Sequence, residues 1–453
     1  MDERRIERRV SRRDVLKWGM GAAGLAFMDW SRVGALAAPE RALGAAERAA
    51  VRPRAKSVIQ IWMWGGPSHL DTFDPKPELG RDYCGPLVNP IPTNVDGVRI
   101  GEMLPLLAQQ ADKYSIIRSM THGVNGHETA AYMVQTGRNP EDTLVYPSAG
   151  AVVSMFKGYD HGYKGLIAPY VVLTTSLGRF SEVGFLDPRY KPFVTGGDPN
   201  QKVFNVEGVL SPGITEERQR SRRELLHELD TLGKALPEHP QFQKLDACEE
   251  KAYGMVLGDA GKLFDLSQEK DELRDAYGRS KFGQSCLMAR RLVEYGVPYI
   301  TINYGGWDTH KQHFEAMRRQ LPDMDRGMSM LLKDLAGRGL LDSTVVWWSG
   351  EFGRTPKVQW GEPWNGGRSH FGNCFSAVLA GGGFRGGHVV GASDATGENV
   401  ATRPVYPQDV IGSIYERLGI DPDGPLPNPR GLNVQVMPCA DNSPGHGRLK
   451  EIM

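Results

Sequence analysis

The chain alternates short runs of apolar residues with longer amphipathic stretches, a pattern typical of strands that alternate with helices. Apolar runs predict strands at residues 56–64, 114–120, 168–175, 297–303, 344–349 and 373–379, and a hairpin arm at 386–390. Helical spacing marks residues 104–112, 129–135, 215–234, 241–262, 269–295, 311–337 and 407–418. This alternation predicts an α/β fold with a mostly parallel central sheet covered by helices on both faces.

The composition adds little to this picture. Hydrophobic residues make up 40% and charged residues 24% of the 453, which is ordinary for a soluble globular protein. Lys plus Arg equals Asp plus Glu at 54 each, so net charge gives no reason to expect a nucleic acid or a membrane surface as a partner. The five cysteines form no C-x-x-C pair, and no disulfide framework is predicted.

The amino terminus resembles an export signal, although an ordinary basic amphipathic helix is the alternative interpretation. Residues 11–17, which include Arg12 and Arg13, resemble the twin-arginine motif, and an apolar region follows that is too short for a membrane span. We therefore predict a signal peptide at residues 1–37, a linker at 38–55 and one α/β domain at 56–453, with a loop-rich and helical insertion at about 182–280. Export through the twin-arginine machinery predicts a periplasmic or otherwise extracytoplasmic protein without a permanent membrane span.

Carboxylate and imidazole side chains follow several of the predicted strands. Asp71 comes after the first strand, Asp308 and His310 follow the strand at 297–303, Glu351 follows the strand at 344–349, and His370 precedes the last strand. Open α/β sheets bind ligands at the carboxyl ends of their strands, and mixed oxygen and nitrogen donors suit divalent metals. We expect these five residues to hold one or more divalent ions, such as Zn, Mn or Ca.

Ordinary structural roles would also account for the same residues. The Asp308–His310 pair is compatible with helix capping, Glu351 with an ion pair to Arg354, and Asp71 with a turn around the neighbouring prolines.

A second group of residues concerns the substrate. His127 and Thr129 stand where a helix begins, and the first N–H groups of a helix attract anions. Thr129 is the best candidate for a metal-activated nucleophile, with His127 as a second catalytic or ligating group, although Thr129 is also an ordinary first-turn residue. Lys76, Arg138 and Arg354 are candidates for holding an anionic substrate, because arginine forks match its oxygens.

Three motifs carry a family resemblance: residues 65–77, 306–310 and 349–356, together with the glycine-rich approach to His370. Over about residues 56–437 the chain resembles the exported family catalogued as "domain of unknown function 1501", which is related to the alkaline phosphatase and sulfatase superfamily. The resemblance implies that fold and metal-assisted phosphoryl or sulfuryl transfer. It implies that Asp308 and His310 form one ligand group, that His370 is the last histidine ligand, and that His127 stands at the nucleophile position.

The chain also departs from the superfamily pattern. None of its cysteines lies in the C/S-x-P/A-x-R context from which sulfatases make formylglycine, so that chemistry is disfavoured. Phe352 replaces an expected histidine, and the first strand ends in Gly65 and Gly66 where an aspartate is expected. The leading hypothesis is an exported metal-dependent hydrolase of phosphate or sulfate esters. The alternatives are a non-catalytic exported binding or assembly protein and a metal-dependent mutase.

Overall fold

The computed structural model describes residues 54–176, 182–201, 204, 206, 216–229, 260–439 and 447–453. The predicted signal peptide at 1–37, nearly all of the linker at 38–55 and parts of the insertion at 182–280 lie outside the described residues and stay predictions. Among the residues that are described, no helix combines the length and the apolar character needed to cross a membrane.

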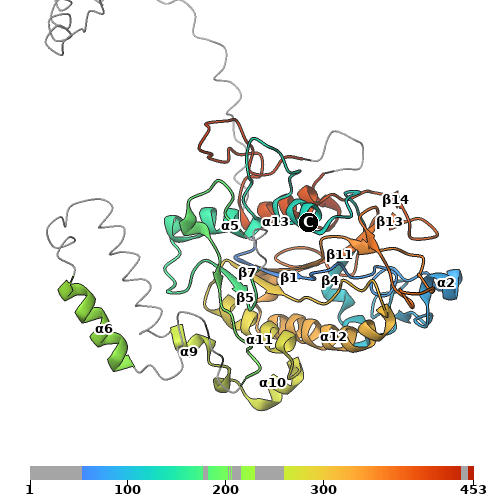
Figure 1. Cartoon of the computed structure of the whole chain (residues 1–453), viewed down its shortest axis with the longest axis horizontal. Helices are drawn as coiled ribbons and strands as arrows, with labels where there is room; N and C mark the ends of the chain where they lie inside the picture. The colour runs from blue at the N-terminus through green and yellow to red at the C-terminus, as the bar shows by residue number, and fades with distance from the viewer. Residues whose placement is uncertain are drawn as a thin grey trace, which may run out of the picture. The chain divides into compact units, whose positions relative to one another are not determined.

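An eight-stranded sheet forms the centre of the domain (Figure 1). From edge to edge its strands are β12 (Val389–Val390), β4 (Tyr114–Met120), β11 (Phe375–Gly381), β8 (Thr344–Ser349), β1 (Ser57–Trp62), β7 (Tyr299–Asn303), β5 (Tyr170–Leu173) and β6 (Phe193–Val194). Strand β11 runs antiparallel to β4 and β8, and the other neighbouring pairs are parallel. The predicted mostly parallel sheet is therefore confirmed.

Strand β1 shows why the central strands read as continuous apolar runs. All its residues are buried, and successive side chains point to opposite faces of the sheet. Ile59 and Ile61 join one hydrophobic cluster, while Val58 and Trp62 join the other. Because both faces need apolar side chains, the strand cannot alternate between apolar and polar residues.

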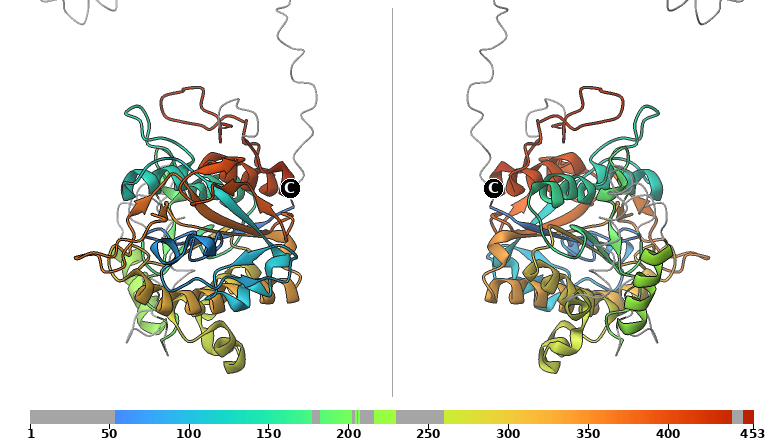
Figure 2. Two further views of the ribbon diagram at one scale, coloured as in Figure 1. Left: turned by 90° about the vertical axis from the view of Figure 1, so that its right-hand side faces the viewer. Right: turned by 90° about the vertical axis from the view of Figure 1, so that its left-hand side faces the viewer.

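Helices cover both faces of the sheet, as predicted (Figures 1 and 2). On one face lie α3 (Pro105–Ala108), α10 (Asp271–Tyr277), α11 (Lys281–Glu294) and α12 (His313–Gly337), and on the other lie α4 (His127–Thr136), α5 (Ala149–Lys157) and α13 (Pro407–Leu418). The remaining described helices are α2 (Arg81–Cys84), α6 (Glu216–Leu229) and α9 (Ala260–Phe264), and short strand pairs join β2 (Ile91–Pro92) to β3 (Arg99–Ile100), β9 (Gly353–Arg354) to β10 (His370–Phe371), and β13 (Ala392–Ser393) to β14 (Val400–Thr402).

Three predicted elements were wrong. The helix expected at 104–112 is the short α3, which ends at Ala108 and is followed by a 3-10 turn at Ala111–Lys113. The single helix expected at 269–295 is two helices, because Gly278 ends α10 at a φ of 90° and the Ser280 hydroxyl caps α11 by accepting from the Gly283 N–H. The hairpin arm expected at 386–390 is the edge strand β12, which pairs in parallel with β4. A strand of two residues is too short for its sequence to indicate its partner.

The parallel register places the loops after β1, β7 and β8 side by side. Trp62, at the end of β1, pairs with Asn303 of β7 and Ser349 of β8. Gly65, with a φ of 110°, allows the first loop to press against the second, since a Cβ there would lie 2.2 Å from the Asp308 nitrogen. Gly367 likewise approaches His310, whose carbonyl oxygen would lie 1.7 Å from an added Cβ. Glycine is thus required where the strand-end loops converge.

Candidate metal centre

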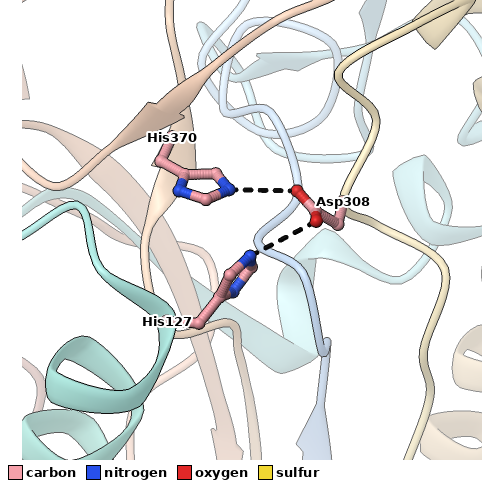
Figure 3. Close-up of side chains that lie close together, drawn as sticks. All are labelled: His127, Asp308 and His370. Atoms are coloured by element: carbon pink, nitrogen blue, oxygen red, sulfur yellow. Dashed lines mark hydrogen bonds and ion pairs between the residues drawn. The ribbon is translucent and has the colours of Figure 1, made fainter.

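Three of the predicted site residues surround one point at the carboxyl edge of the sheet (Figure 3). His370 Nε2 lies 3.1 Å from Asp308 Oδ1, and His127 Nε2 lies 3.3 Å from Asp308 Oδ2. One ligand atom from each residue falls within 4.8 Å of the others. His310 stands beside them, with its Nε2 3.0 Å from Asp308 Oδ1 and 2.8 Å from His370 Nε2. The group is assembled from the first residue of α4, the loop after β7, and β10.

The Nδ1 atoms of His127 and His370 already have hydrogen-bond partners. His127 Nδ1 lies 2.7 Å from Glu351 Oε1, and His370 Nδ1 lies 2.7 Å from the Asn125 carbonyl oxygen. Ionised carboxylates and carbonyls only accept, so each Nδ1–H is the donor. In the neutral rings both Nε2 lone pairs then face the carboxylate of Asp308. Among the described residues His310 can donate to His370 Nε2 at 2.8 Å, whereas His127 Nε2 faces Asp308 favourably only with a proton of its own or with a cation between them.

The charges around this point are set by burial and by Arg354. Burial alone would raise the pKa of Asp308, but the hydrogen bond and charge of Arg354 lower it to about 2. The hydrogen bond from His127 to Glu351 raises the pKa of His127, whereas partial burial, with nearby positive charge, lowers the pKa of His310. Asp308 therefore stays an anionic donor wherever the imidazoles are neutral.

Two buried side chains, Glu351 and Arg354, support His127 and Asp308 from the protein interior. Glu351 is fully buried and accepts the Gly65 N–H at 2.9 and 3.2 Å in addition to its contact with His127. Arg354, predicted to bind substrate, is also fully buried and donates to Asp308 Oδ1 at 2.5 Å and to the carbonyls of Gly65 and Gly66. Both side chains thus fix the orientation of His127 and Asp308, and neither faces solvent.

Asp71, predicted to be a ligand, lies in a different cluster. Its carboxylate is 2.8 Å from His313 Nε2 and 3.0 Å from Arg368 Nε, and its side chain is 1% exposed. Burial opposes ionisation, but Arg368 and His313 hold the pKa of Asp71 far below its ordinary value. The described contacts place Asp71 with these two residues and not with Asp308.

The other predicted substrate and nucleophile residues are not brought to Asp308 by any described contact. Lys76 pairs with Asp74 at 3.3 Å. Arg138 follows the far end of α4, about 15 Å from His127 along a helix of ten residues, and lies over the Tyr146 ring. Thr129 is exposed and sits two positions after His127, so it faces another side of the helix.

Sequence reasoning missed several supporting groups. The Asn125 carbonyl has no signature in the sequence, because every residue carries one. His122, whose Nε2 lies 2.6 Å from the Glu351 carbonyl oxygen, stands in the same polar loop as His127, and that spacing was a usable signal. Trp64 stacks on the His127 ring at 5.7 Å between centroids.

The fold and this group of residues define an α/β protein with a candidate metal centre at the carboxyl ends of its strands. The chain matches the family described as "Protein of unknown function (DUF1501)" over residues 55–442, and it belongs to that family. The resemblance drawn from the three motifs is therefore confirmed. No curated protein sequence matches the chain.

Solved structures similar to the chain belong to the alkaline phosphatase and sulfatase superfamily. The lipoteichoic acid synthase LtaP from Listeria monocytogenes is 10% identical, over 86% of this chain and 76% of that one, with a TM-score of 0.36. The PsFucS1 sulfatase from Pseudoalteromonas sp. is 13% identical over 86% and 73%, with a TM-score of 0.35. A protein in the alkaline phosphatase superfamily from Vibrio parahaemolyticus is 10% identical over 82% and 68%, at 0.36.

Proposed function

We propose that this chain is an exported, metal-dependent hydrolase of phosphate or sulfate esters. One observation carries the proposal: two imidazole Nε2 atoms face one carboxylate while each Nδ1 is already engaged by an acceptor. Nitrogen and oxygen donors together suit Zn²⁺ or Mn²⁺, whereas Ca²⁺ prefers oxygen alone. The donor set therefore narrows the predicted ions to a transition metal.

The residues present fit such an ion. His127, Asp308 and His370 would hold it, with His310 as a fourth donor beside them. A bound divalent ion would supply Lewis-acid polarisation of the ester and a water of lowered pKa. The buried Glu351 keeps the Nε2 atom of His127 aimed inward, as outer partners of metal-binding histidines do.

The beginning of α4 supports an anionic substrate. Gly126 occupies the N-cap position of this ten-residue helix and offers no side-chain acceptor for the first-turn N–H groups. These groups and the positive end of the helix dipole lie next to His127, the first residue of the helix. Ester oxygens carrying negative charge would be stabilised there.

The nucleophile is best assigned to water. Thr129 is exposed and faces a different side of α4 from His127, and no cysteine lies in a formylglycine context. The lack of a recognisable side-chain nucleophile also favours a second candidate, an exported metal-binding protein without catalysis. The two candidates differ in one measurable property, which is turnover.

The test uses the full chain recovered from the extracytoplasmic compartment, with an Arg12→Lys/Arg13→Lys variant as the export control. Metal analysis should find about one transition-metal ion per chain, and aryl phosphates or sulfates should be hydrolysed.

His370→Ala should lower turnover by at least about 100-fold, whereas His161→Ala, at an exposed histidine bonded to the Met155 carbonyl, should leave it unchanged. Zinc binding without turnover would select the second candidate. Export of the double-lysine variant would refute the twin-arginine route.

A further inference from the structure

A cavity of about 690 Å³ has Trp64, Tyr304 and Gly305 in its lining, and Trp64 links it to the candidate metal centre through His127. The Trp64 ring that forms part of this lining stacks on the His127 ring at 5.7 Å and 24°. The backbone N–H of Trp64 donates to the Tyr304 carbonyl at 3.0 Å, and the Trp64 carbonyl accepts from the Trp307 N–H at 3.2 Å. The cavity and the centre are therefore built from the same two loops, those after β1 and β7.

Three aromatic residues, Trp64, Phe282 and Tyr304, lie in the lining together with polar residues that include Lys281, Asn303 and Asp323. Phe282 and Tyr304 stack on each other at 4.2 Å and 16°. The Tyr304 hydroxyl donates to Asp323 at 3.0 Å, and Asn303 donates to the Thr175 carbonyl at 3.1 Å. The Tyr304 hydroxyl and Asn303 Nδ2 thus have partners within the protein, whereas Asn303 Oδ1 has none among the described residues. The cavity therefore offers an occupant the faces and edges of fixed rings together with this acceptor and the Lys281 ammonium.

We propose that this cavity is the subsite for the alcohol part of the ester, and that this alcohol carries a ring with an apolar face. The inference rests on the proposed function. The volume falls in the range of roughly 300–1,000 Å³ found for small-molecule sites, well above the space that the anion alone needs. An aryl ring and the apolar face of a sugar share the stacking chemistry that Trp64 and Tyr304 offer.

The reaction fixes what the subsite holds before and after turnover. The oxygen of water forms the new bond to phosphorus or sulfur, the bond to the ester oxygen breaks, and a proton from the water ends on the released alcohol. The ring stays in the cavity until this alcohol leaves. Because the ring contacts the aromatic side chains of the lining, substrates with a ring should bind more tightly than substrates without one.

A glycine allows the cavity to be filled without strain. Gly305 lines it, is exposed, has no positive φ, and has no heavy atom within 4 Å of an added Cβ. The backbone should therefore tolerate Gly305→Phe, which adds a ring at the lining of the cavity. Gly337, near the end of α12, is also exposed with open space at its Cβ, and Gly337→Phe is the matched control.

The test compares phenyl phosphate, glucose 1-phosphate and methyl phosphate on the zinc-loaded full chain. Gly305→Phe should raise KM about tenfold for the ring substrate that the wild type prefers, and should change kcat/KM for methyl phosphate by less than about twofold. Gly337→Phe should change neither value. Whether phenyl or glucose phosphate is preferred identifies the ring as aryl or sugar.

A second readout does not depend on catalysis. Saturation-transfer NMR with phenol and with methyl glucoside should show binding of the preferred ring to the wild type and to Gly337→Phe, and none to Gly305→Phe. Ring binding that Gly305→Phe blocks, without hydrolysis of any ester, would overturn the hydrolase proposal and leave a ring-binding site. Ester hydrolysis with an unchanged KM in Gly305→Phe, and no ring binding, would overturn this inference and leave the hydrolase.

Discussion

Two clusters, each built around an aspartate on a loop that follows a strand, combine carboxylate, imidazole and guanidinium groups, and they differ in exposure and in the partners of their ring nitrogens. In the cluster of Asp71, His313 and Arg368 every side chain is at most 1% exposed. His313 donates from Nε2 to Asp71, and its Nδ1 accepts from the Thr309 hydroxyl at 2.6 Å. Both ring nitrogens are satisfied with the ring neutral, which agrees with a pKa of His313 that burial lowers.

The cluster around Asp308 is open and incomplete by comparison. The Asp308 side chain is 43% exposed and that of His127 is 26% exposed. Here the imidazoles of His127 and His370 give their Nδ1 protons to outer acceptors, and their Nε2 lone pairs remain directed at Asp308. The comparison shows that carboxylate and imidazole groups alone do not define a candidate metal centre. The hydrogen-bond partners of the histidine ring nitrogens and the exposure of the carboxylate distinguish it from a structural cluster.

Breaking the closed cluster should give the largest effect. Asp71→Ala leaves the fully buried Arg368 guanidinium without its carboxylate, and we expect a loss of about 3–5 kcal/mol in the free energy of unfolding. Urea denaturation measures this loss. Asp160→Ala, which removes an exposed partner of Arg189, is the control and should cost less than about 1 kcal/mol. Equal effects of the two substitutions would contradict the structural role of Asp71.

Replacing Glu351, the hydrogen-bond partner of His127 Nδ1, should weaken metal binding with little effect on the fold. Glu351→Gln replaces an obligate acceptor of the His127 Nδ1–H with a group that can also donate, so the ring is less firmly aimed. We expect zinc affinity to fall about 10- to 100-fold in a chelator competition titration. Glu272→Gln, on the exposed surface of α10, is the matched control. Unchanged affinity in Glu351→Gln would show that Glu351 does not position a ligand.

The pH dependence of zinc binding sharpens the comparison. Because Glu351 raises the pKa of His127, the metal-free ring keeps its proton to a pH above its ordinary value of 6.5. Zinc must displace that proton, so affinity should rise by about tenfold per pH unit below the raised pKa and level off above it. Asp308, with a pKa of about 2, should add no slope in this range. A flat profile between about pH 5 and 8 would exclude His127 as a ligand.

Much of the fold could be predicted because its signals are local. The strand at 114–120, the strand at 344–349 and the helix at 407–418 have the bounds expected from hydrophobic periodicity. The helix break at Gly278 was missed, since charged residues on both sides continue the helical spacing. The antiparallel direction of β11 depends on a distant pairing with β4 and β8, which the sequence of the strand does not encode.

The candidate site was predictable as a set of residue types and not as a geometry. Asp71 and Asp308 both follow a strand and a glycine-rich turn, and their sequence contexts indicate the same role for both. The difference arises from partners far along the chain, since Arg368 and His313 enclose the buried Asp71. Asp308 also pairs with an arginine, Arg354, but it is partly exposed and still faces His127 and His370. The Asn125 carbonyl, which fixes the His370 tautomer, has no side-chain signature at all.

The most direct measurement is a crystal structure of the full chain grown with zinc, with anomalous difference maps recorded at the zinc edge. We expect one strong peak between His127 Nε2, His370 Nε2 and the Asp308 carboxylate, at about 2.0–2.2 Å from each, and loss of the peak in His370→Ala. A peak elsewhere, or an empty site with His127 and His370 still turned toward Asp308 at saturating zinc, would contradict the proposed metal centre.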